Sequence, residues 1–465
     1  MRISVKNLGA IDQAEFTLGE MTIICGTNNT GKTYVTHATY GFFDYLRSGF
    51  RLSVSDTDIS SLLSNGTVTI DIGTYVSDLQ KHLKSAAKNY SQILNKVFSG
   101  NDKLFENSEF HFTLETKAQY TATEVDLRFG SAEKSVLQIH KPEGSEQLQV
   151  TLIVDKMGGD VPRRSFIEDM ISNSIRELII GSIIPKPFIA SAERTGAAIF
   201  QKELDFTRNR LVELLGDKSS KFHPIQFLGK FSGEYPLAVR RNVDFIRDLP
   251  NISKRESVIL KNHPEILDNF RDIIGGEYKV SKDGEIQYIP ENNKRIKLAL
   301  VESSSAVRSL LDIGFYLRHV AAPGDLLMVD EPELNLHPEN QRRVARLFSR
   351  LVNLGIKVFV TTHSDYFIKE LNTLIMLNQK SPRLIEIAKR EGYKADELLD
   401  ANCVRVYIAE EASIKLDGGK KKTKKRTLVK ADIDQKMGIE ARSFDKTIED
   451  MNRVQEEIVW GGDEQ

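Results

Sequence analysis

The chain has 465 residues, and its 64 basic residues nearly balance its 65 acidic residues, so overall charge does not indicate a general nucleic-acid binder. Its two cysteines are too few for a disulfide framework or a metal cluster, and no apolar run approaches the roughly 20 residues that a membrane-spanning helix needs. A strand is expected from Arg2 onward, which leaves no room for a signal peptide. We therefore expect a cytoplasmic protein of one large domain with insertions, or of two to three lobes.

The first motif is a glycine-rich loop between a predicted strand at 21–25 and a predicted helix at 34–46. Residues 26–33 read GTNNTGKT, which fits the phosphate-loop pattern G-x-x-x-x-G-K-[ST] at every fixed position. In such a loop the backbone N–H groups surround a polyphosphate, the lysine reaches the β- and γ-phosphates, and the last hydroxyl binds Mg²⁺. Thr33 is therefore a predicted Mg²⁺ ligand. The predicted ATP-binding residues of the loop are Gly26, Asn28, Asn29, Thr30, Gly31, Lys32 and Thr33.

An insertion is predicted after the loop helix, over residues 51–185. It begins with a helical stretch at 75–98 and ends with an amphipathic helix at 165–184. Between them, a period of two in hydrophobicity predicts antiparallel strands at 109–116, 123–129, 136–140 and 148–155.

A core strand is predicted at 187–190, and the segment after it contains Arg194. Two roles for this arginine stay open, namely contact with the nucleotide or a partner subunit, and a structural ion pair. Residues 197–275 are predicted to be mostly helical, and a β-hairpin is predicted at 277–280 and 285–289. No heptad pattern persists beyond a few turns, so long coiled-coil arms are not expected.

Residues 326–332 (LLMVDEP) are predicted to be an apolar strand that ends in two acids. Asp330 is placed to hold the Mg²⁺ shell, and Glu331 is placed to orient and deprotonate an attacking water. A buried strand with a solvated acidic turn would explain the strand but not the two adjacent acids.

A second apolar strand is predicted at 356–362 and ends at His363. A polar residue at the carboxyl end of a buried parallel strand lies where α/β folds place their ligands. His363 is therefore predicted to contact the γ-phosphate side of the site.

The order of these motifs resembles the ABC-type ATPases, and within them the RecF and OLD (overcoming lysogenisation defect) branch rather than membrane transporters. The resemblance implies that residues 330–338 (DEPELNLHP) contain the magnesium aspartate, the catalytic glutamate and the D-loop, and that His363 is the switch histidine. It implies a signature segment before a helical run at 307–320, although Ala306 stands where this branch often has glycine. The residues implied to contact a partner subunit's γ-phosphate are Ser303, Ser304 and Ser305.

The implied fold is α/β, an ABC-type P-loop ATPase core with an antiparallel β-lobe and a helical lobe, plus a small C-terminal α+β extension. The resemblance also implies a homo-oligomer, either a head-to-tail dimer or a larger ring. We predict four parts. Residues 1–185 form an N-terminal ATPase lobe with the phosphate loop and the β insertion, and residues 186–300 form a helical lobe with the hairpin. Residues 301–380 form the part of the core with the signature, acid pair, D-loop and switch histidine, and residues 381–465 form the C-terminal extension.

The C-terminal part is predicted to contain paired strands at 403–409 and 427–433 and a final helix at 444–459. Between the strands lies a basic loop, 415–426. One interpretation is a solvated hairpin tip whose lysines protect a strand edge. The other is a docking site for DNA or an acidic phage protein.

Four acids in this part, Glu410, Glu411, Asp432 and Asp434, are similar to the metal-binding acids of TOPRIM nucleases. A basic loop occupies the space where a βαβ unit would be needed, so a nuclease is not expected in this chain. The chain instead resembles the ATPase subunit of two-gene phage-defence systems such as PARIS, which implies an ATP-hydrolysing sensor and scaffold that controls a separate effector, a TOPRIM nuclease. The alternative is a RecF-like DNA-repair ATPase. The long insertion and the degenerate signature disfavour the nucleotide-binding subunit of a transporter.

Overall fold

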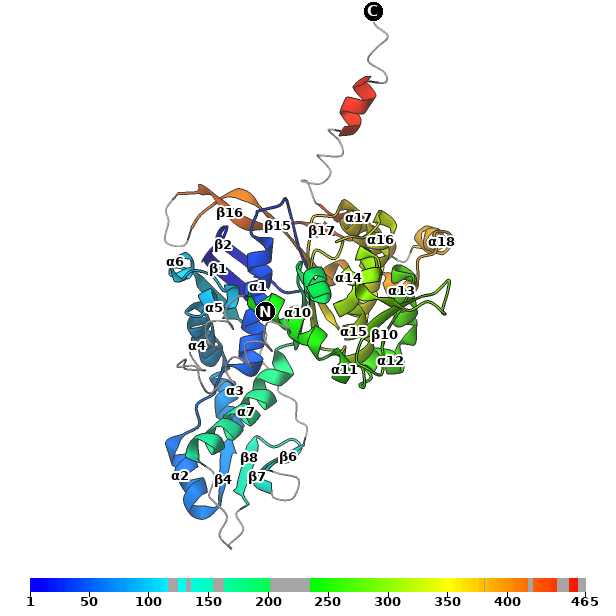
Figure 1. Ribbon diagram of the computed structural model, residues 1–465. Coiled ribbons are helices and arrows are strands. Elements are labelled where there is room, and N and C mark those ends of the chain that lie inside the picture. Colours follow the sequence, from blue (N-terminus) through cyan, green and yellow to red (C-terminus); the bar gives the residue numbers. More distant parts are fainter. Residues whose placement is uncertain are drawn as a thin grey trace, which may run out of the picture. The chain divides into compact units, whose positions relative to one another are not determined.

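The computed structural model describes residues 1–115, 124–130, 135–153, 163–200, 235–379, 381–416, 421–440 and 451–458. They belong to two compact units (Figure 1). Unit 1 consists of Met1–Ile3, Gly41–Gln92 and Phe110–Lys186, and unit 2 consists of Ser4–Tyr40, Ile93–Glu109 and Pro187–Gln465. The division into four parts stays a prediction.

A six-stranded sheet is the centre of unit 2. Five of its strands are parallel and the edge strand β16 is antiparallel to β15. Every side chain of β3 and β13 is buried, as in parallel sheets covered on both faces, and this explains their continuous apolar sequence. In sheet order the strands are β16 (Thr423–Lys430), β15 (Val404–Ile414), β3 (Met21–Cys25), β14 (Lys357–Thr362), β13 (Leu326–Asp330) and β9 (Pro187–Ala190).

The main helices of unit 2 begin at the residues that the local sequence dictates. Helix α1 (Lys32–Ser48) starts inside the phosphate loop and continues into unit 1. Helix α16 (Pro338–Asn353) has proline in its first turn, and helix α17 (Asp365–Leu377) begins after Ser364, whose hydroxyl accepts from Phe367 N at 3.2 Å. Helices α16 and α17 lie side by side (Figure 1) and bring Phe348 against Phe367 in the core.

The helical part of unit 2 surrounds a small antiparallel sheet. The hairpin of β10 (Gly276–Val280) and β11 (Ile286–Pro290) confirms the prediction, and β12 (Leu298–Ala299) extends it. The predicted helix at 307–320 is two helices, α14 (Ser305–Ser309) and α15 (Leu311–His319). The other described elements are α5 (Leu94–Phe98), α6 (Asp102–Phe105), α10 (Leu237–Arg247), α11 (Leu249–Ile252), α12 (Val258–Asn262), α13 (Pro264–Ile274), α18 (Pro382–Arg390), β17 (Ile433–Asp434), β18 (Gly438–Ile439) and the 3₁₀ turns Leu300–Glu302, Ala395–Glu397 and Ala401–Cys403.

Unit 1 contains an antiparallel sheet of order β4-β8-β7-β6. Three of its strands confirm the period-of-two prediction, whereas β4 was not predicted. The predicted strand at 109–116 is β5 (Glu109–Thr113), which belongs to a different sheet of order β2-β1-β5. The predicted helix at 75–98 is interrupted, because α3, α4 and α5 are separate helices. The elements of unit 1 are α2 (Asp56–Asn65), β4 (Thr67–Asp71), α3 (Ile72–Ser77), α4 (Leu79–Ser91), β6 (Val125–Gly130), β7 (Ser135–Lys141), β8 (Gln147–Leu152) and α7 (Arg164–Ile183). Of the other sheet, β1 (Arg2–Leu8) belongs mostly and β2 (Ile11–Thr17) wholly to unit 2.

The predicted basic loop at 415–426 is partly a strand. Strand β15 continues to Ile414 and β16 already begins at Thr423, so Lys424 lies opposite Ser413 in the ladder. Cross-strand charge pairing stabilises this extension, because Lys424 Nζ lies 3.0 Å from a carboxylate oxygen of Glu411. Residues 417–420, and residues 444–450 and 459 of the predicted final helix, lie outside the described residues, whereas 451–458 are helical. No helix in the described ranges is long and apolar enough to cross a membrane.

Candidate functional site

Three predicted motifs meet at one edge of the central sheet. The phosphate loop follows β3, Glu331 follows β13 and His363 follows β14, and β14 pairs in parallel with both of the other strands. The register places Asp330 opposite Thr361 and Thr362 opposite Cys25. Because parallel neighbours end at the same edge, residues up to 337 positions apart in the chain converge there.

Both glycines of the phosphate loop are required by its backbone. Gly26 has φ 136° and Gly31 has φ 94°, conformations that other residues rarely adopt. A Cβ atom on Gly26 would lie 2.6 Å from the Ala409 carbonyl oxygen, and one on Gly31 would lie 2.8 Å from an Ile11 side-chain carbon. Strand β15, which contains Ala409, therefore leaves no space for a side chain at the start of the loop.

The Lys32 side chain lies across the loop and is 6% exposed. Its Nζ donates to the carbonyl oxygens of Gly26 at 3.0 Å and Thr27 at 2.8 Å. Burial lowers the pKa of Lys32, while the carboxylates of Glu331 and Asp330 oppose this shift. Of the other predicted loop residues, two are exposed and two are half-buried, namely Asn28, Asn29, Thr30 and Thr33.

Asp330 is 1% exposed and has an unsatisfied oxygen. One carboxylate oxygen accepts from the Thr361 hydroxyl, whereas Oδ2 has no hydrogen-bond partner in the described structure. His37 Nε2 lies 4.0 Å from Asp330 Oδ2 and is also without a hydrogen bond, and burial lowers the pKa of His37. A buried carboxylate oxygen without a donor fits a ligand of a hard cation.

The residues at this edge can hold Mg²⁺ only together with other ligands. Asp330 supplies a carboxylate, and Thr33, at the start of α1, supplies a hydroxyl. Within the described ranges, no group of three or more His, Cys, Asp or Glu side chains is arranged to hold a metal ion. This donor set fits a nucleotide-bound Mg²⁺, which takes most of its ligands from phosphate and water.

Glu331 has a strained backbone and a half-buried side chain. Its φ of 51° lies in the left-handed region, which is uncommon for residues other than glycine and recurs at functional sites. Its N–H donates to the Thr361 carbonyl at 3.0 Å, which fixes the turn after β13. Burial, and next the Asp330 carboxylate, raise the pKa of Glu331. A raised pKa brings a carboxylate closer to the range suited to a general base.

Glu333 is a site residue that the sequence reasoning missed. Its Oε1 accepts from the Thr362 hydroxyl and from His363 N, both at 2.8 Å, and the residue is 8% exposed. His363 Nδ1 lies 3.4 Å from Glu333 Oε1 and 3.6 Å from Glu331 Oε1. Glu333 thus links the turn after β13 to the end of β14 and positions the His363 backbone. The signal available in the sequence was the third acid, two residues after Glu331.

The serine segment does not join the other motifs within the described structure. The Ser303 hydroxyl donates to Leu300 O at 2.6 Å, and Ser304 accepts from Val307 N at 3.3 Å as the N-cap of α14. Ser304 and Ser305 are exposed, whereas Ser303 is buried. No hydrogen bond among the described residues connects these serines to the phosphate loop.

Arg194 is buried behind the acid pair and is 1% exposed. Neither open interpretation fits this position, because the guanidinium is not exposed to a ligand or a partner and bonds to main-chain oxygens rather than to a carboxylate. It donates to the carbonyl oxygens of Ser309 at 2.6 Å, Asp330 at 2.7 Å, Ser191 at 2.8 Å and Glu331 at 2.9 Å.

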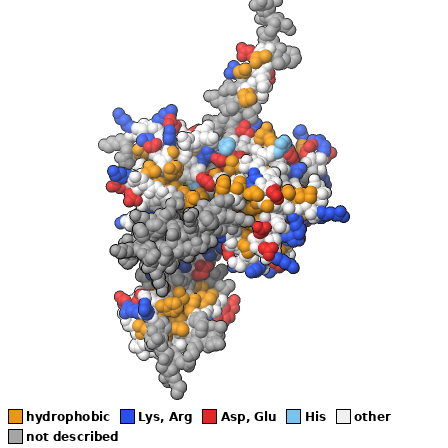
Figure 2. Space-filling model, viewed as in Figure 1, with side chains coloured by type: hydrophobic (Ala, Val, Ile, Leu, Met, Phe, Trp, Pro, Cys, Tyr) orange, Lys and Arg blue, Asp and Glu red, His pale blue; other side chains and the backbone are white. Residues whose placement is uncertain are grey.

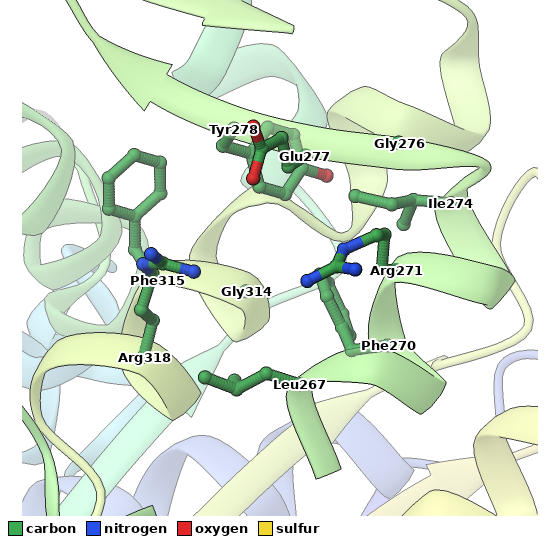
Figure 3. A pocket seen from close by; sticks show the side chains of 10 residues that line it. All are labelled: Leu267, Phe270, Arg271, Ile274, Gly276, Glu277, Tyr278, Gly314, Phe315 and Arg318. Atoms are coloured by element: carbon green, nitrogen blue, oxygen red, sulfur yellow. The ribbon is translucent and has the colours of Figure 1, made fainter. Parts of the chain in front are cut away.

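A pocket elsewhere in unit 2 is lined by α13, β10 and α15 (Figure 3). Its volume of about 40 Å³ holds little more than one water molecule, so it is too small for a nucleotide. The guanidinium groups of Arg271 and Arg318 project into it beside Phe270 and Phe315. None of its lining residues belongs to the motifs at the sheet edge.

Comparison with known proteins gives a family match over residues 1–368, to the family described as AAA ATPase domain. No curated protein matches the chain. Similar solved structures include an SmcHead bound to the C-winged helix domain of ScpA, with TM-score 0.34, 12% identity and coverage of 91% of this chain and 97% of that chain. The SMC head domain from Thermotoga maritima has TM-score 0.25, 12% identity and coverage of 79% and 90%.

A third structure is an Smc head domain with an extended coiled coil bound to the C-terminal domain of ScpA, derived from Pyrococcus furiosus. It has TM-score 0.32, 11% identity and coverage of 98% of both chains. The α/β prediction of a P-loop ATPase core is confirmed by the parallel sheet, the phosphate loop between β3 and α1, and the family match. Because the matched family covers residues 1–368 of 465, the chain belongs to the AAA ATPase domain family.

Proposed function

We propose that this protein binds ATP with Mg²⁺ at the edge of the central sheet, hydrolyses it, and uses the ATP-bound assembly to control a separate effector protein in anti-phage defence. The observation that carries the ATPase assignment is the convergence of Lys32, Asp330, Glu331 and His363 from three neighbouring strands. The family supports nucleotide binding, and a cytoplasmic location is part of the proposal.

The residues have separate roles in the proposed reaction. Lys32 leaves the carbonyl oxygens of Gly26 and Thr27 and turns its ammonium group to the β- and γ-phosphates. Thr33 and Asp330 would hold Mg²⁺, which would supply positive charge to neutralise the phosphates. Glu331 orients the attacking water and accepts its proton, and His363, positioned by Glu333, faces the γ-phosphate.

A second subunit completes the proposed site. Ser304 and Ser305 are exposed and unconnected to the phosphate loop of their own subunit, so they are available to the ATP of a neighbour. This supports a head-to-tail dimer, or a larger ring built from the same contact.

Mixing two inactive variants tests this arrangement. Lys32→Ala removes the phosphate-binding lysine and Ser304→Arg blocks the serine segment, so a mixed dimer has one site with both lesions and one intact site. At random mixing, half of the dimers are mixed, and activity should return to roughly a quarter of wild type.

Two controls make the mixing result specific. Lys32→Ala mixed with the Lys32→Ala, Ser304→Arg double variant contains no intact phosphate loop and should stay inactive. Ser60→Arg introduces the same side chain at an exposed serine of α2 and should retain activity. Failure to recover activity, with subunit exchange demonstrated by differently tagged subunits, would refute shared sites.

The control of a separate effector follows from the resemblance to the ATPase subunits of two-gene defence systems. Glu411, one of the acids considered as a nuclease ligand, is paired with Lys424 and Arg426 instead. Purification of the protein with its native gene neighbours, followed by mass spectrometry, tests this part. Recovery of a nuclease that is released when ATP is removed would support it, whereas recovery of replication proteins would support the RecF-like alternative.

One observation bears on that DNA-binding alternative. Strand β16 is an edge strand with three consecutive basic residues, but Lys425 Nζ lies 2.9 Å from Asp12, and Arg426 lies 3.7 Å from Glu411. On the face visible in Figure 2, Lys and Arg side chains are interspersed with Asp and Glu. Both features reduce the positive potential available to a DNA backbone, so we rank effector control first.

A further inference from the structure

Arg194 connects the acid pair Asp330 and Glu331 to helix α14, which carries the serine segment. The proposed function assigns these two motifs to different ATP molecules. Its Nε donates to Ser309, the last residue of α14, and its Nη atoms donate to Asp330 and Glu331, at the end of β13. Asp330 and Glu331 act on ATP bound by their own subunit. Helix α14 begins with Ser305, which serves the ATP of the partner subunit. The guanidinium therefore lies between the catalytic acids of one site and the signature helix of the other.

A second connection runs parallel to the first. The Ser309 hydroxyl donates to Leu334 O at 3.1 Å, and Leu334 lies three residues after Glu331. Ala306 O, in the same helix, lies 3.0 Å from this hydroxyl and shares its single proton. The C-terminal end of α14 is thus fixed to the segment 330–334 by one bond from Arg194 and one bond from Ser309.

Helix α14 is short, so its two ends lie close together. The helix has five residues, so Ser305 and Ser309 are separated by about 6 Å of helix axis. A displacement of the Ser309 end of this short helix would therefore also displace the Ser305 end. Arg194 connects Ser309 to Glu331, whose φ of 51° is a strained conformation.

An arginine is required because the acceptors lie in different directions. The guanidinium uses Nε, Nη1 and Nη2 for different carbonyl oxygens, and Nη1 also holds Ser191 O at 2.8 Å. A lysine ammonium concentrates its three donors at one atom and cannot span these acceptors. Burial lowers the pKa of Arg194, while four nearby carboxylates oppose this shift, those of Asp312, Asp330, Glu333 and Glu331.

We propose that Arg194 is a positioning residue that couples the two ATP sites of the dimer, by holding the Glu331 turn of one site and the signature helix of the other in a single arrangement. This inference rests on the proposed function, because it requires that sites be shared between subunits. It predicts that occupation of one site changes turnover at the second.

The test uses the full chain with Arg194→Lys and compares it with wild type. We measure binding of a fluorescent ATP analogue, and the dependence of steady-state ATP hydrolysis on ATP concentration. Wild type should show a Hill coefficient above one. In Arg194→Lys the coefficient should fall to one and kcat should fall roughly 10-fold, because Glu331 is misplaced, while the analogue affinity changes by less than about 2-fold.

Ser309→Ala keeps the test decisive if Arg194→Lys fails to fold. Alanine suits a buried helical position and removes the hydroxyl that Leu334 O and Ala306 O share, so the Hill coefficient should fall in the same direction. The matched control is Ser349→Ala in α16, an equally buried serine whose hydroxyl bonds only within its own helix, to Ala345 O at 2.9 Å. This control should retain the wild-type Hill coefficient and kcat.

The outcomes separate this inference from the proposed function. If the mixing experiment restores no activity, shared sites are refuted and the coupling falls with them. If mixing restores activity but wild type has a Hill coefficient of one, or a folded Arg194→Lys keeps the wild-type coefficient and kcat, the coupling alone is refuted. If Arg194→Lys does not fold, an unchanged coefficient in Ser309→Ala refutes it.

Discussion

A buried carboxyl near Arg194 should make the stability of unit 2 depend on pH. Asp312, on α15, is 1% exposed, and its Oδ2 has no hydrogen-bond partner in the described structure. Burial raises the pKa of Asp312 from 3.8 to about 7, although the Arg194 guanidinium acts in the opposite direction. The perturbation that tests this is Asp312→Asn, which keeps the size of the side chain and removes the titration.

The sign and the size of the effect follow from proton linkage. The folded state binds the Asp312 proton more tightly than the unfolded state does. Protonation of Asp312 therefore stabilises the folded state in full below pH 3.8, and this stabilisation is lost as pH rises through 7. At about 1.4 kcal/mol per pKa unit, the full difference is about 4 kcal/mol. Between pH 5 and pH 8 the linkage relation gives a loss of about 2.5 kcal/mol.

Urea denaturation followed by circular dichroism measures this loss. We compare the free energies of unfolding of wild type and Asp312→Asn at several pH values from 5 to 8. Wild type should lose about 2.5 kcal/mol relative to the variant over this range, because only wild type must ionise a buried carboxyl. Asp283→Asn, in the exposed turn of the β10–β11 hairpin, is the control and should follow wild type. Parallel curves for wild type and Asp312→Asn would refute the reasoning.

Glu331→Gln should bind ATP but hydrolyse it at least ~100-fold more slowly in single-turnover assays, because a positioned base contributes roughly 10²–10⁴-fold, and turnover at the wild-type rate would contradict its role. Lys32→Ala should lose binding of the fluorescent ATP analogue, and wild-type affinity would exclude it as the phosphate ligand. Glu333→Ala should lower kcat as much as His363→Ala, and the double variant should lose no more than either single variant if Glu333 acts through His363. If the basic loop at 415–426 binds DNA, neutralising it should reduce the slope of log K for DNA binding against log salt by about 0.9 per lost phosphate contact. Titration of DNA at several salt concentrations measures this slope. An unchanged slope and an unchanged affinity would show that the basic loop only protects a strand edge. The residues of the basic loop to change to serine are Lys420, Lys421, Lys422, Lys424, Lys425 and Arg426.

The sequence predicted the elements whose signal is local. The phosphate loop has four fixed residues between an apolar strand and a helix. The acid pair stands at the end of a strand whose five residues, Asp330 included, are all buried. Parallel pairing then explains why the ends of β3, β13 and β14 meet, so that most of the candidate site could be assembled from motifs alone.

Features that depend on distant partners could not be predicted. Arg194 binds carbonyl oxygens of residues up to 137 positions away, and main-chain acceptors leave no trace in sequence. Strand β15 was predicted, but its pairing with β3 joins residues almost 400 positions apart. The predicted helix at 75–98 divides at Asp78 and at 92–93, and neither Asp78 nor Ile93 caps the helix that follows with its side chain, so no capping signal marks these breaks in the sequence.

The pairing of β15 with β3 sets the smallest fragment that can carry the nucleotide site. The family match ends at residue 368, but β15 begins at Val404 and covers the full length of β3, from Met21 to Cys25. In a protein truncated after residue 368, β3 would become an open edge strand. Its backbone groups on the β15 side would be unpaired, and five apolar or small side chains would lie beside the phosphate loop. Such a fragment should aggregate, whereas one that extends through Lys430 retains both strands. The folding unit of this ATPase therefore exceeds the segment by which its family is recognised.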